Sequence, residues 1–209
     1  MHITLIGMAR VGKTTWADRL VADAGFIKID CDERIVKRLG LLLDASANNE
    51  QFLAIMAAWM GHPYAPQYPE NSRQFIQCES TVMEEALEEL RGPLKSKHVV
   101  LDATGSVIYT KSSILQSLKD STNITYLQAS LEHQAILFQS YIKNPSPVIW
   151  GDNAYAPKEG ETEMDALKRC YPELLASRAK RYEQIADVII PFDRHRTVTD
   201  IRLLVPEFR

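Results

Sequence analysis

The stretch that most constrains this chain is GMARVGKTT at residues 7–15, directly after the apolar run HITLI at residues 2–6. Four residues separate Gly7 from Gly12, and Lys13 and Thr14 follow at once, which is the spacing of a P-loop. Such a turn wraps backbone N–H groups around phosphate oxygens, and the next helix directs its positive end at them. In this pattern Lys13 reaches the β- and γ-phosphates and the Thr14 hydroxyl ligates Mg²⁺. The predicted nucleotide-binding residues are Gly7, Met8, Ala9, Arg10, Val11, Gly12, Lys13, Thr14 and Thr15.

The residues around the loop fit a buried strand before it and an amphipathic helix after it. Apolar residues within 17–24 recur at the spacing of one helical face, and Gly25 stands where a helix C-cap is expected. Arg10 is unusual, because many P-loops carry glycine or another small residue there. Its side chain can project outward from the loop, so we expect it to be tolerated.

The composition bounds the class of protein. A length of 209 residues fits one domain, a sheet covered by helices on both faces. A net charge of −3 gives no reason to expect a nucleic acid or an anionic membrane as partner, and no apolar run approaches the length of a membrane span. Three scattered cysteines are too few for a disulfide framework or a zinc site. We expect a monomer in the reducing cytoplasm, without a signal peptide.

Apolar strands and helical patterns alternate along the chain. After the first helix, further strands are predicted at residues 25–30, 98–103, 123–129 and 186–191. Helices are predicted at residues 31–43, 48–60, 73–90, 109–119 and 131–143, with a long one ending near residue 186. Strands that alternate with helices form a parallel sheet, and ligands bind at the carboxyl ends of its strands. We therefore predict an α/β fold in a single domain over residues 1–209.

Two polar segments that contain several prolines interrupt this pattern. Residues 61–72, GHPYAPQYPENS, read as a loop. Residues 144–161, NPSPVIWGDNAYAPKEGE, are too polar and broken to be core. Beside a phosphate site such a segment is typical of a mobile lid, and the alternative is a disordered surface loop.

Carboxylates follow two of the predicted strands. Asp30 and Asp32 could hold a metal-bound water and accept a proton from an attacking hydroxyl, so with Lys13 they are the catalytic candidates. The alternative is that one of them only N-caps the next helix. Asp102 fits the acidic strand end that supports Mg²⁺ in P-loop enzymes. The predicted metal ligands are Thr14, Asp30 and Asp102.

The small residues Thr104, Gly105 and Ser106 follow Asp102 and would let a substrate approach the backbone closely. The alternative is an ordinary turn. Residues 102–105 also match the D-x-x-G of GTPase switches. That interpretation is set aside, because more chain separates the motif from the P-loop than in small GTPases and no Asn-Lys-x-Asp motif occurs.

Taken together, these segments resemble the shikimate kinase family, within the nucleoside-monophosphate-kinase-like group of P-loop kinases. The likeness rests on GMARVGKTT, IDCDERI, an arginine at the start of the third helix, ATGS, ITYLQAS and LLASRAKRYEQIADVII. It implies a three-layer fold, with helices on both faces of a five-stranded parallel sheet in the order 2-3-1-4-5. It also implies a substrate-binding helical section at residues 31–92 and a closing lid at residues 144–161.

The resemblance implies an ATP-dependent, Mg²⁺-requiring kinase that phosphorylates a hydroxyl of shikimate or a related hydroxy acid. By motif, Asp32, Arg73 and Arg178 match the residues that grip the hydroxyls and carboxylate of shikimate, although either arginine alone could be a solvated surface residue. The predicted substrate-binding residues are Asp32, Arg73, Thr104, Gly105, Ser106 and Arg178. The alternatives are a kinase for a different, larger hydroxyl compound and a nucleotide-binding regulatory protein without turnover.

The chain departs from the family in four places. The family's Gly-Gly-Gly is Thr104-Gly105-Ser106 here, and its lid Arg-Pro pair is matched by Lys143-Asn144-Pro145. An arginine that stacks on adenine is missing from LEHQAILF. An insertion at about residues 44–72 lengthens the helical section, and its ring-bearing residues either enlarge the pocket or pack locally: Trp59, His62, Tyr64 and Tyr68. An enlarged pocket would favour a hydroxy acid bulkier than shikimate.

Overall fold

The structure, a computed structural model, describes residues 1–41, 49–143, 147–151 and 154–205. The strands are β1 (His2–Ile6), β2 (Ile27–Asp30), β3 (Val99–Asp102), β4 (Asn123–Leu127) and β5 (Val188–Ile190). The α-helices are α1 (Lys13–Ala24), α2 (Cys31–Arg38), α3 (Asn49–Met60), α4 (Tyr68–Arg91), α5 (Ser112–Ser121), α6 (Leu131–Lys143), α7 (Glu163–Ile185) and α8 (Phe192–Thr197). Short 3₁₀ helices occur at η1 (Val107–Tyr109) and η3 (Ile201–Leu203). None of the described helices has the length and apolar character needed to span a membrane.

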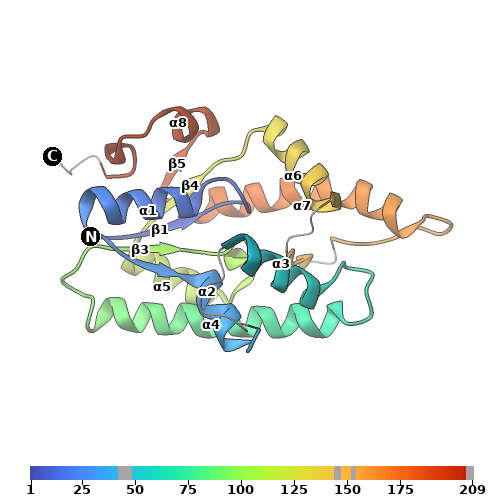
Figure 1. Cartoon of the computed structure of the whole chain (residues 1–209), viewed down its shortest axis with the longest axis horizontal. Coiled ribbons are helices and arrows are strands. Elements are labelled where there is room, and N and C mark those ends of the chain that lie inside the picture. Colours follow the sequence, from blue (N-terminus) through green and yellow to red (C-terminus); the bar gives the residue numbers. More distant parts are fainter. Residues whose placement is uncertain (42–48, 144–146, 152–153, 206–209) are drawn as a thin grey trace.

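The strands pair in parallel in the order β2-β3-β1-β4-β5, which confirms the predicted α/β fold and sheet order. Figure 1 shows α1 and α8 above the sheet and α2 and α4 below it. Parallel sheets are covered on both faces, which is why β1 and β3 are almost entirely buried. Asp102 of β3 is in register with Leu5 of β1 and with Asp30 of β2. The segments that follow these three strands therefore leave the sheet at one edge.

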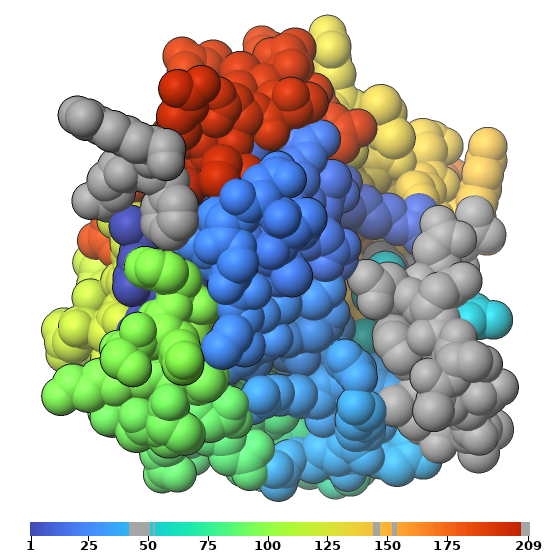
Figure 2. Space-filling view, turned by 60° about the vertical axis from the view of Figure 1, so that its left-hand side comes forward, coloured from blue at the N-terminus to red at the C-terminus, as the bar shows by residue number. Residues whose placement is uncertain are grey.

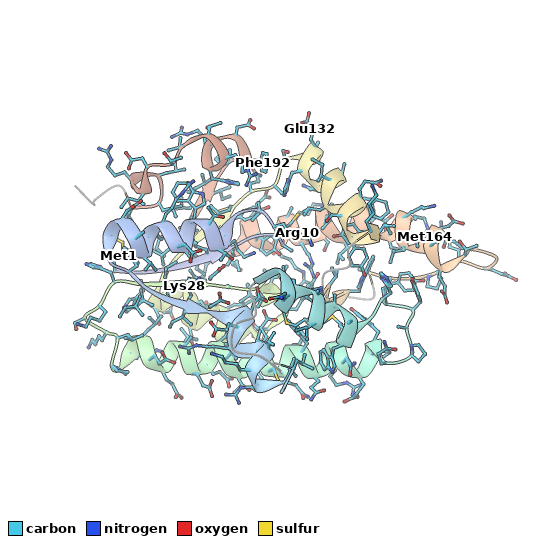
Figure 3. All side chains as sticks on the ribbon, in the orientation of Figure 1. Met1, Arg10, Lys28, Glu132, Met164 and Phe192 are labelled. Carbon is cyan, nitrogen blue, oxygen red and sulfur yellow. The ribbon has the colours of Figure 1, made fainter. Side chains whose placement is uncertain are left out.

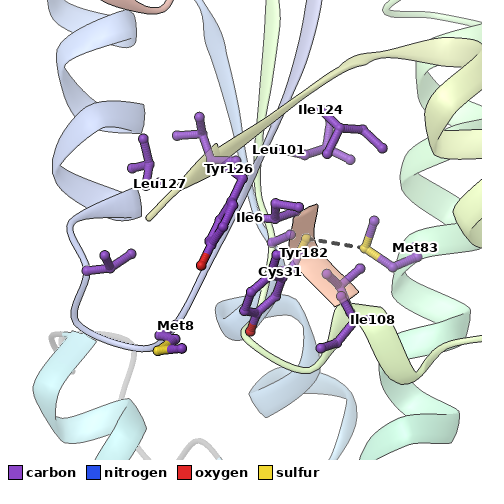
Figure 4. Packing of buried hydrophobic residues seen from close by; sticks show 14 of the residues in the cluster. Ile6, Met8, Cys31, Met83, Leu101, Ile108, Ile124, Tyr126, Leu127 and Tyr182 are labelled. Atoms are coloured by element: carbon purple, nitrogen blue, oxygen red, sulfur yellow. Dashed lines mark hydrogen bonds between the residues drawn. The ribbon is translucent and has the colours of Figure 1, made fainter. Parts of the chain in front are cut away.

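Aromatic and sulfur-containing side chains join the sheet to its helices and the helices to one another. The rings of Tyr126 in β4 and Tyr182 in α7 lie 5.1 Å apart, and Cys31 Sγ lies 3.7 Å from Met83 Sδ (Figure 4). On the α1 side, Trp16 is buried and its Nε1 donates to the His195 carbonyl oxygen of α8 at 3.1 Å. Figure 2 shows the N-terminal residues, in blue, between the red C-terminal helices and the green end of α4. The C-terminal segment is thus anchored on the helix that follows the P-loop.

Some element boundaries differ from the sequence prediction. The helix predicted from residue 73 begins at Tyr68, inside the predicted loop, because a proline in its first turn has no N–H to leave unpaired. The helix predicted over residues 31–43 ends at Arg38, and Gly40 with a φ of 67° follows. The pattern at residues 109–119 divides into η1 and α5, and α8 and η3 were not predicted.

Candidate active site

The P-loop connects the end of β1 to the start of α1. Gly7 and Gly12 have φ angles of 144° and 109°, and a Cβ on Gly7 would stand 2.6 Å from the Leu127 carbonyl oxygen, so the loop requires glycine there. Lys13 opens α1, and its Nζ donates to the carbonyl oxygens of Gly7 and Met8 at 3.1 Å each. The ammonium group is therefore held at the centre of the loop, among the backbone groups that would surround a phosphate.

A cavity of about 280 Å³ lies beside the P-loop, among α3, α4, α6, α7 and the segments after β2 and β3. Figure 3 shows Arg10, one of its lining residues, between α3 below and α6 above. The predicted site residues that line it are Met8, Ala9, Arg10, Gly12, Lys13, Thr14, Thr15, Asp32, Asp102, Thr104, Gly105, Ser106 and Arg178. Gly7, Val11, Asp30 and Arg73 do not line it. The structure therefore brings the phosphate loop and most of the predicted acceptor residues to one cavity.

Asp32 and Asp102 present two carboxylates to this cavity near Lys13. Burial raises the pKa of Asp32 to about 7; the Lys13 ammonium opposes that rise, and the carboxylates of Asp102 and Asp30 add to it. Burial also raises the pKa of Asp102, against the Lys13 ammonium and the hydrogen-bonded Thr14 hydroxyl, which lower it. A carboxylate with a pKa near 7 can accept a proton near neutral pH, which suits Asp32 to act as a general base.

Asp30 is engaged elsewhere. Its Oδ1 accepts a hydrogen bond from the Glu33 backbone N–H at 3.0 Å and caps α2, and its Oδ2 lies 3.7 Å from Lys28 Nζ. An N-cap aspartate satisfies a backbone donor at the start of a helix and needs no metal. Asp30 therefore has the N-cap position that the alternative described and does not line the cavity, and its catalytic or metal-binding role stays a prediction.

Glu79 of α4 is a site residue that the sequence prediction missed. Its side chain is 0% exposed, and its carboxylate accepts hydrogen bonds from the hydroxyls of Thr104 and Ser106, the latter at 2.8 Å. Burial raises the pKa of Glu79 to about 7, the two hydroxyls lower it, and nearby Asp32 raises it again. Two of the three small residues after β3 thus line the cavity and at the same time hold a buried acid behind it.

Arg178 of α7 supplies a buried cation to the same cavity. It is 6% exposed, and its Nη2 donates to the Ile149 carbonyl oxygen at 2.7 Å. A Cβ on Gly105 would lie 3.5 Å from its Nη1, an ordinary contact, so the loop after β3 and the guanidinium are direct neighbours. Within the described part of the chain, its Nε has no hydrogen-bond partner. A guanidinium with donors to spare is suited to hold a carboxylate.

Arg73 lies outside the cavity. Its side chain is 61% exposed and forms an ion pair with Glu70, one turn earlier on the solvent side of α4. Because α4 begins at Tyr68, Arg73 falls in its second turn, while Phe75 of α4 lines the cavity and Glu79 lies behind it. The predicted substrate-binding role of Arg73 is therefore not supported, and the surface alternative describes it.

The predicted lid contributes buried residues. Two of its stretches lie outside the described residues, namely 144–146 and 152–153. Val148, Ile149 and Trp150 are buried, so the expectation that the segment is too polar for the core is wrong for these three residues. The Tyr68 hydroxyl donates to the Val148 carbonyl oxygen at 3.1 Å and accepts from the Trp150 backbone N–H at 2.7 Å. Val148 and Ile149 line the cavity, and α4 holds them in place.

The aromatic residues of the insertion pack against neighbouring helices and the predicted lid. His62 Nδ1 lies 3.2 Å from the Tyr141 hydroxyl, and the Tyr64 ring lies 6.2 Å from the Tyr155 ring. Tyr155 in turn lies 5.6 Å from the Trp150 ring, edge to face. All four ring-bearing residues of the insertion lie within the described part of the chain, and none of them lines the cavity: Trp59, His62, Tyr64 and Tyr68. Of the two interpretations of the insertion, the structure favours local packing over an enlarged pocket.

Oxygen ligands for a divalent cation are present, but sparse. Within the described ranges, no three acidic, histidine or cysteine side chains gather closely enough to hold a metal ion. Mg²⁺ commonly binds through one or two carboxylates together with substrate phosphates and water. Asp102 and the Thr14 hydroxyl, both at the cavity, fit that mode of binding.

Several solved structures share this fold. The shikimate kinase from Acinetobacter baumannii in complex with shikimate matches with a TM-score of 0.62 and 21% identity, over 100% of this chain and 95% of that chain. The enzyme from Bacteroides thetaiotaomicron matches with a TM-score of 0.59 and 16% identity, over 99% and 98% of the two chains. The enzyme from Aquifex aeolicus gives 0.59 and 18%, over 99% and 96%.

No protein-family profile and no curated protein matches the sequence. At the identities of the solved structures the likeness shows the fold. The chain therefore has the P-loop kinase fold seen in shikimate kinases, as the sequence resemblance predicted.

Proposed function

We propose that this chain is an ATP-dependent kinase that transfers the γ-phosphoryl group to a hydroxyl of a small hydroxy acid, shikimate or a related compound. The observation that carries the proposal is the single cavity lined by Lys13 of the P-loop, Asp32 and Arg178. A phosphate loop, a proton acceptor and a carboxylate anchor are the groups that such a transfer needs. The full-length likeness to shikimate kinases supports the same class of reaction.

Five of the cavity residues have roles in this reaction. Bound MgATP would supply the phosphoryl group and a cation that offsets its charge. Lys13 and the P-loop N–H groups would hold the phosphates, and Thr14 and Asp102 would ligate the cation. Asp32 would orient the acceptor hydroxyl and take its proton, and Arg178 would hold the acceptor's carboxylate.

A kinase for a different hydroxyl compound is the second candidate. The observation that favours it is the position of Arg73. Two arginines were predicted to hold the acceptor, but Arg73 lies at the surface and only Arg178 of the two lines the cavity. A guanidinium paired with a carboxylate contributes affinity and orientation. An acceptor with a weaker or smaller acidic group than shikimate would fit this end of the cavity better.

An acceptor screen tests the proposal. ADP release from ATP would be measured with shikimate, other hydroxy acids and neutral polyols, in the wild type and in Lys13→Ala. Release that depends on an added hydroxy acid and is lost in the variant supports the kinase. Release that depends only on a neutral polyol favours the second candidate. ATP binding without turnover on any acceptor would instead indicate a nucleotide-binding regulatory protein.

A further inference from the structure

Arg10 adopts an unusual backbone conformation. Its φ is 60°, and it is the only non-glycine residue with a positive φ in the described part of the chain. A residue with a β-carbon is disfavoured in this left-handed region, whereas glycine is not. Strained residues persist where the surroundings require them, often at ligand-binding sites. The strained backbone of Arg10 therefore indicates a local requirement for this residue at the P-loop.

The Arg10 guanidinium lies at the cavity without an acidic partner. Its Nη1 donates to the Ser140 hydroxyl of α6 at 2.5 Å, and the side chain lines the cavity together with Gly12 and Lys13. Figure 3 shows it in the space between α3 and α6. Other arginines of the chain, such as Arg34 and Arg169, each pair with a glutamate, at 2.5 Å and 2.7 Å. Among the residues that the structure describes, Arg10 has no such pair, so its charge is available to a ligand.

The chemistry of this position points to phosphate. A guanidinium presents a planar fork of N–H donors that matches phosphate oxygens bidentately. Arg10 leaves from the same loop whose backbone N–H groups and Lys13 would surround the phosphates. The Ser140 hydroxyl accepts from Nη1 as a neutral oxygen, so the positive charge of Arg10 stays uncompensated.

We propose that Arg10 binds the phosphate chain of the nucleotide directly, as a cation that the P-loop itself supplies from a left-handed position. This inference rests on the proposed function, because it requires that ATP occupies the P-loop. A structural role is the competing explanation, in which Arg10 only ties the P-loop to α6 through Ser140. The first explanation requires the positive charge of Arg10, and the second requires only its hydrogen bond to Ser140.

Calorimetric titration with ATP and with inorganic tripolyphosphate tests the proposal. Arg10→Gly removes the side chain and relaxes the backbone, so the variant should be folded and at least as thermally stable as the wild type. Arg10→Gln keeps the β-carbon and a hydrogen-bond donor but has no charge. Both variants should bind ATP and tripolyphosphate about tenfold to a hundredfold more weakly, the loss expected for a charge-assisted hydrogen bond. Ser140→Ala removes only the tether, and Arg73→Ala removes an arginine outside the cavity, so both should bind within about threefold of the wild type.

The outcomes distinguish a failure of the Arg10 inference from a failure of the proposed kinase function. Weaker binding in both Arg10 variants, with Ser140→Ala and Arg73→Ala unchanged, supports the inference. Wild-type affinity in Arg10→Gln, or an equal loss in Ser140→Ala, overturns it while the kinase proposal stands. A wild-type protein that binds neither ATP nor tripolyphosphate overturns the proposed function and this inference with it.

Discussion

The P-loop end and the acceptor end of the cavity are built in different ways. At the P-loop end, the functional groups come from one short run of sequence, residues 7–15, and backbone conformation sets their positions. At the acceptor end they come from α2, α4, the loop after β3 and α7, and packing brings Asp32, Glu79 and Arg178 together. A local motif can therefore build the P-loop, whereas tertiary structure assembles the groups that we propose bind the acceptor.

The largest effect is expected at the P-loop end, from Lys13→Ala. Loss of a preorganised positive charge at the transferred group should lower phosphoryl transfer by at least about a hundredfold. The fold should persist, because the hydrogen bonds of the Lys13 ammonium go to the carbonyl oxygens of Gly7 and Met8, within the P-loop itself, although the residue is only 8% exposed. Coupled ADP-release assays and circular dichroism measure both effects. Near-normal turnover would place the nucleotide elsewhere.

At the acceptor end, Arg178→Ala and Arg73→Ala form a matched pair. Removing the buried Arg178 should weaken acceptor binding by about 2–5 kcal/mol, because a buried carboxylate would lose its partner. Removing the exposed Arg73 should change it by less than about 0.5 kcal/mol. Calorimetry with the best hydroxy acid and an ATP analogue measures both values. A larger loss in Arg73→Ala than in Arg178→Ala would contradict the site described here.

Glu79→Gln should change how stability depends on pH. The pKa of Glu79 is raised from 4.5 to about 7 in the folded protein, so the folded state holds this proton more tightly than the unfolded chain. The resulting stabilisation is present below about pH 4.5 and is lost as the pH rises through 7, by on the order of 3 kcal/mol at most. Between about pH 5 and pH 8, urea unfolding should therefore show a smaller fall in unfolding free energy for Glu79→Gln than for the wild type. Equal falls would mean that Glu79 is not the buried acid described here.

A smaller and more local effect is expected from Tyr68→Phe. The missing hydroxyl would leave the Val148 carbonyl oxygen and the Trp150 N–H unpaired, at a local cost of about 1–3 kcal/mol. Hydrogen exchange of residues 147–151 should accelerate, while exchange in the P-loop should not. Tyr64→Phe, which keeps the ring contact with Tyr155, serves as the control. Equal exchange in both variants would show that Tyr68 does not hold this segment.

Much of the fold and the whole P-loop could be predicted from the sequence, because both depend on short-range spacing. Alternation of apolar strands with amphipathic helices fixes a parallel sheet, and Gly7 and Gly12 mark a turn that only glycine allows. Asp32 and Asp102, which follow strands, and Arg178, which was assigned from the family resemblance, all line the cavity, and their roles stay predictions.

The errors concern helix phase and packing between distant segments. Arg73 was assigned from the family resemblance, as an arginine at the start of the third helix, whereas α4 begins at Tyr68 and Arg73 lies on its solvent side. The correct signal was Glu79, an acid on the same helical face as the buried Phe75, Val82 and Ala86, since charged residues seldom lie in an apolar stripe unless they have partners. The burial of residues 148–150 depends on Tyr68, far away in sequence, and no local pattern reveals such a contact.

The measurement that most directly tests the central claim, that nucleotide and acceptor meet in one cavity, is acceptor-dependent ADP release in Asp32→Asn together with its ATP affinity. Asp32 lines the cavity with the P-loop, and burial raises its pKa to about 7. We predict a fall in turnover of about a hundredfold or more, because a positioned proton acceptor is lost, with ATP binding retained. Turnover equal to the wild type, with the same hydroxy acid, would contradict the account.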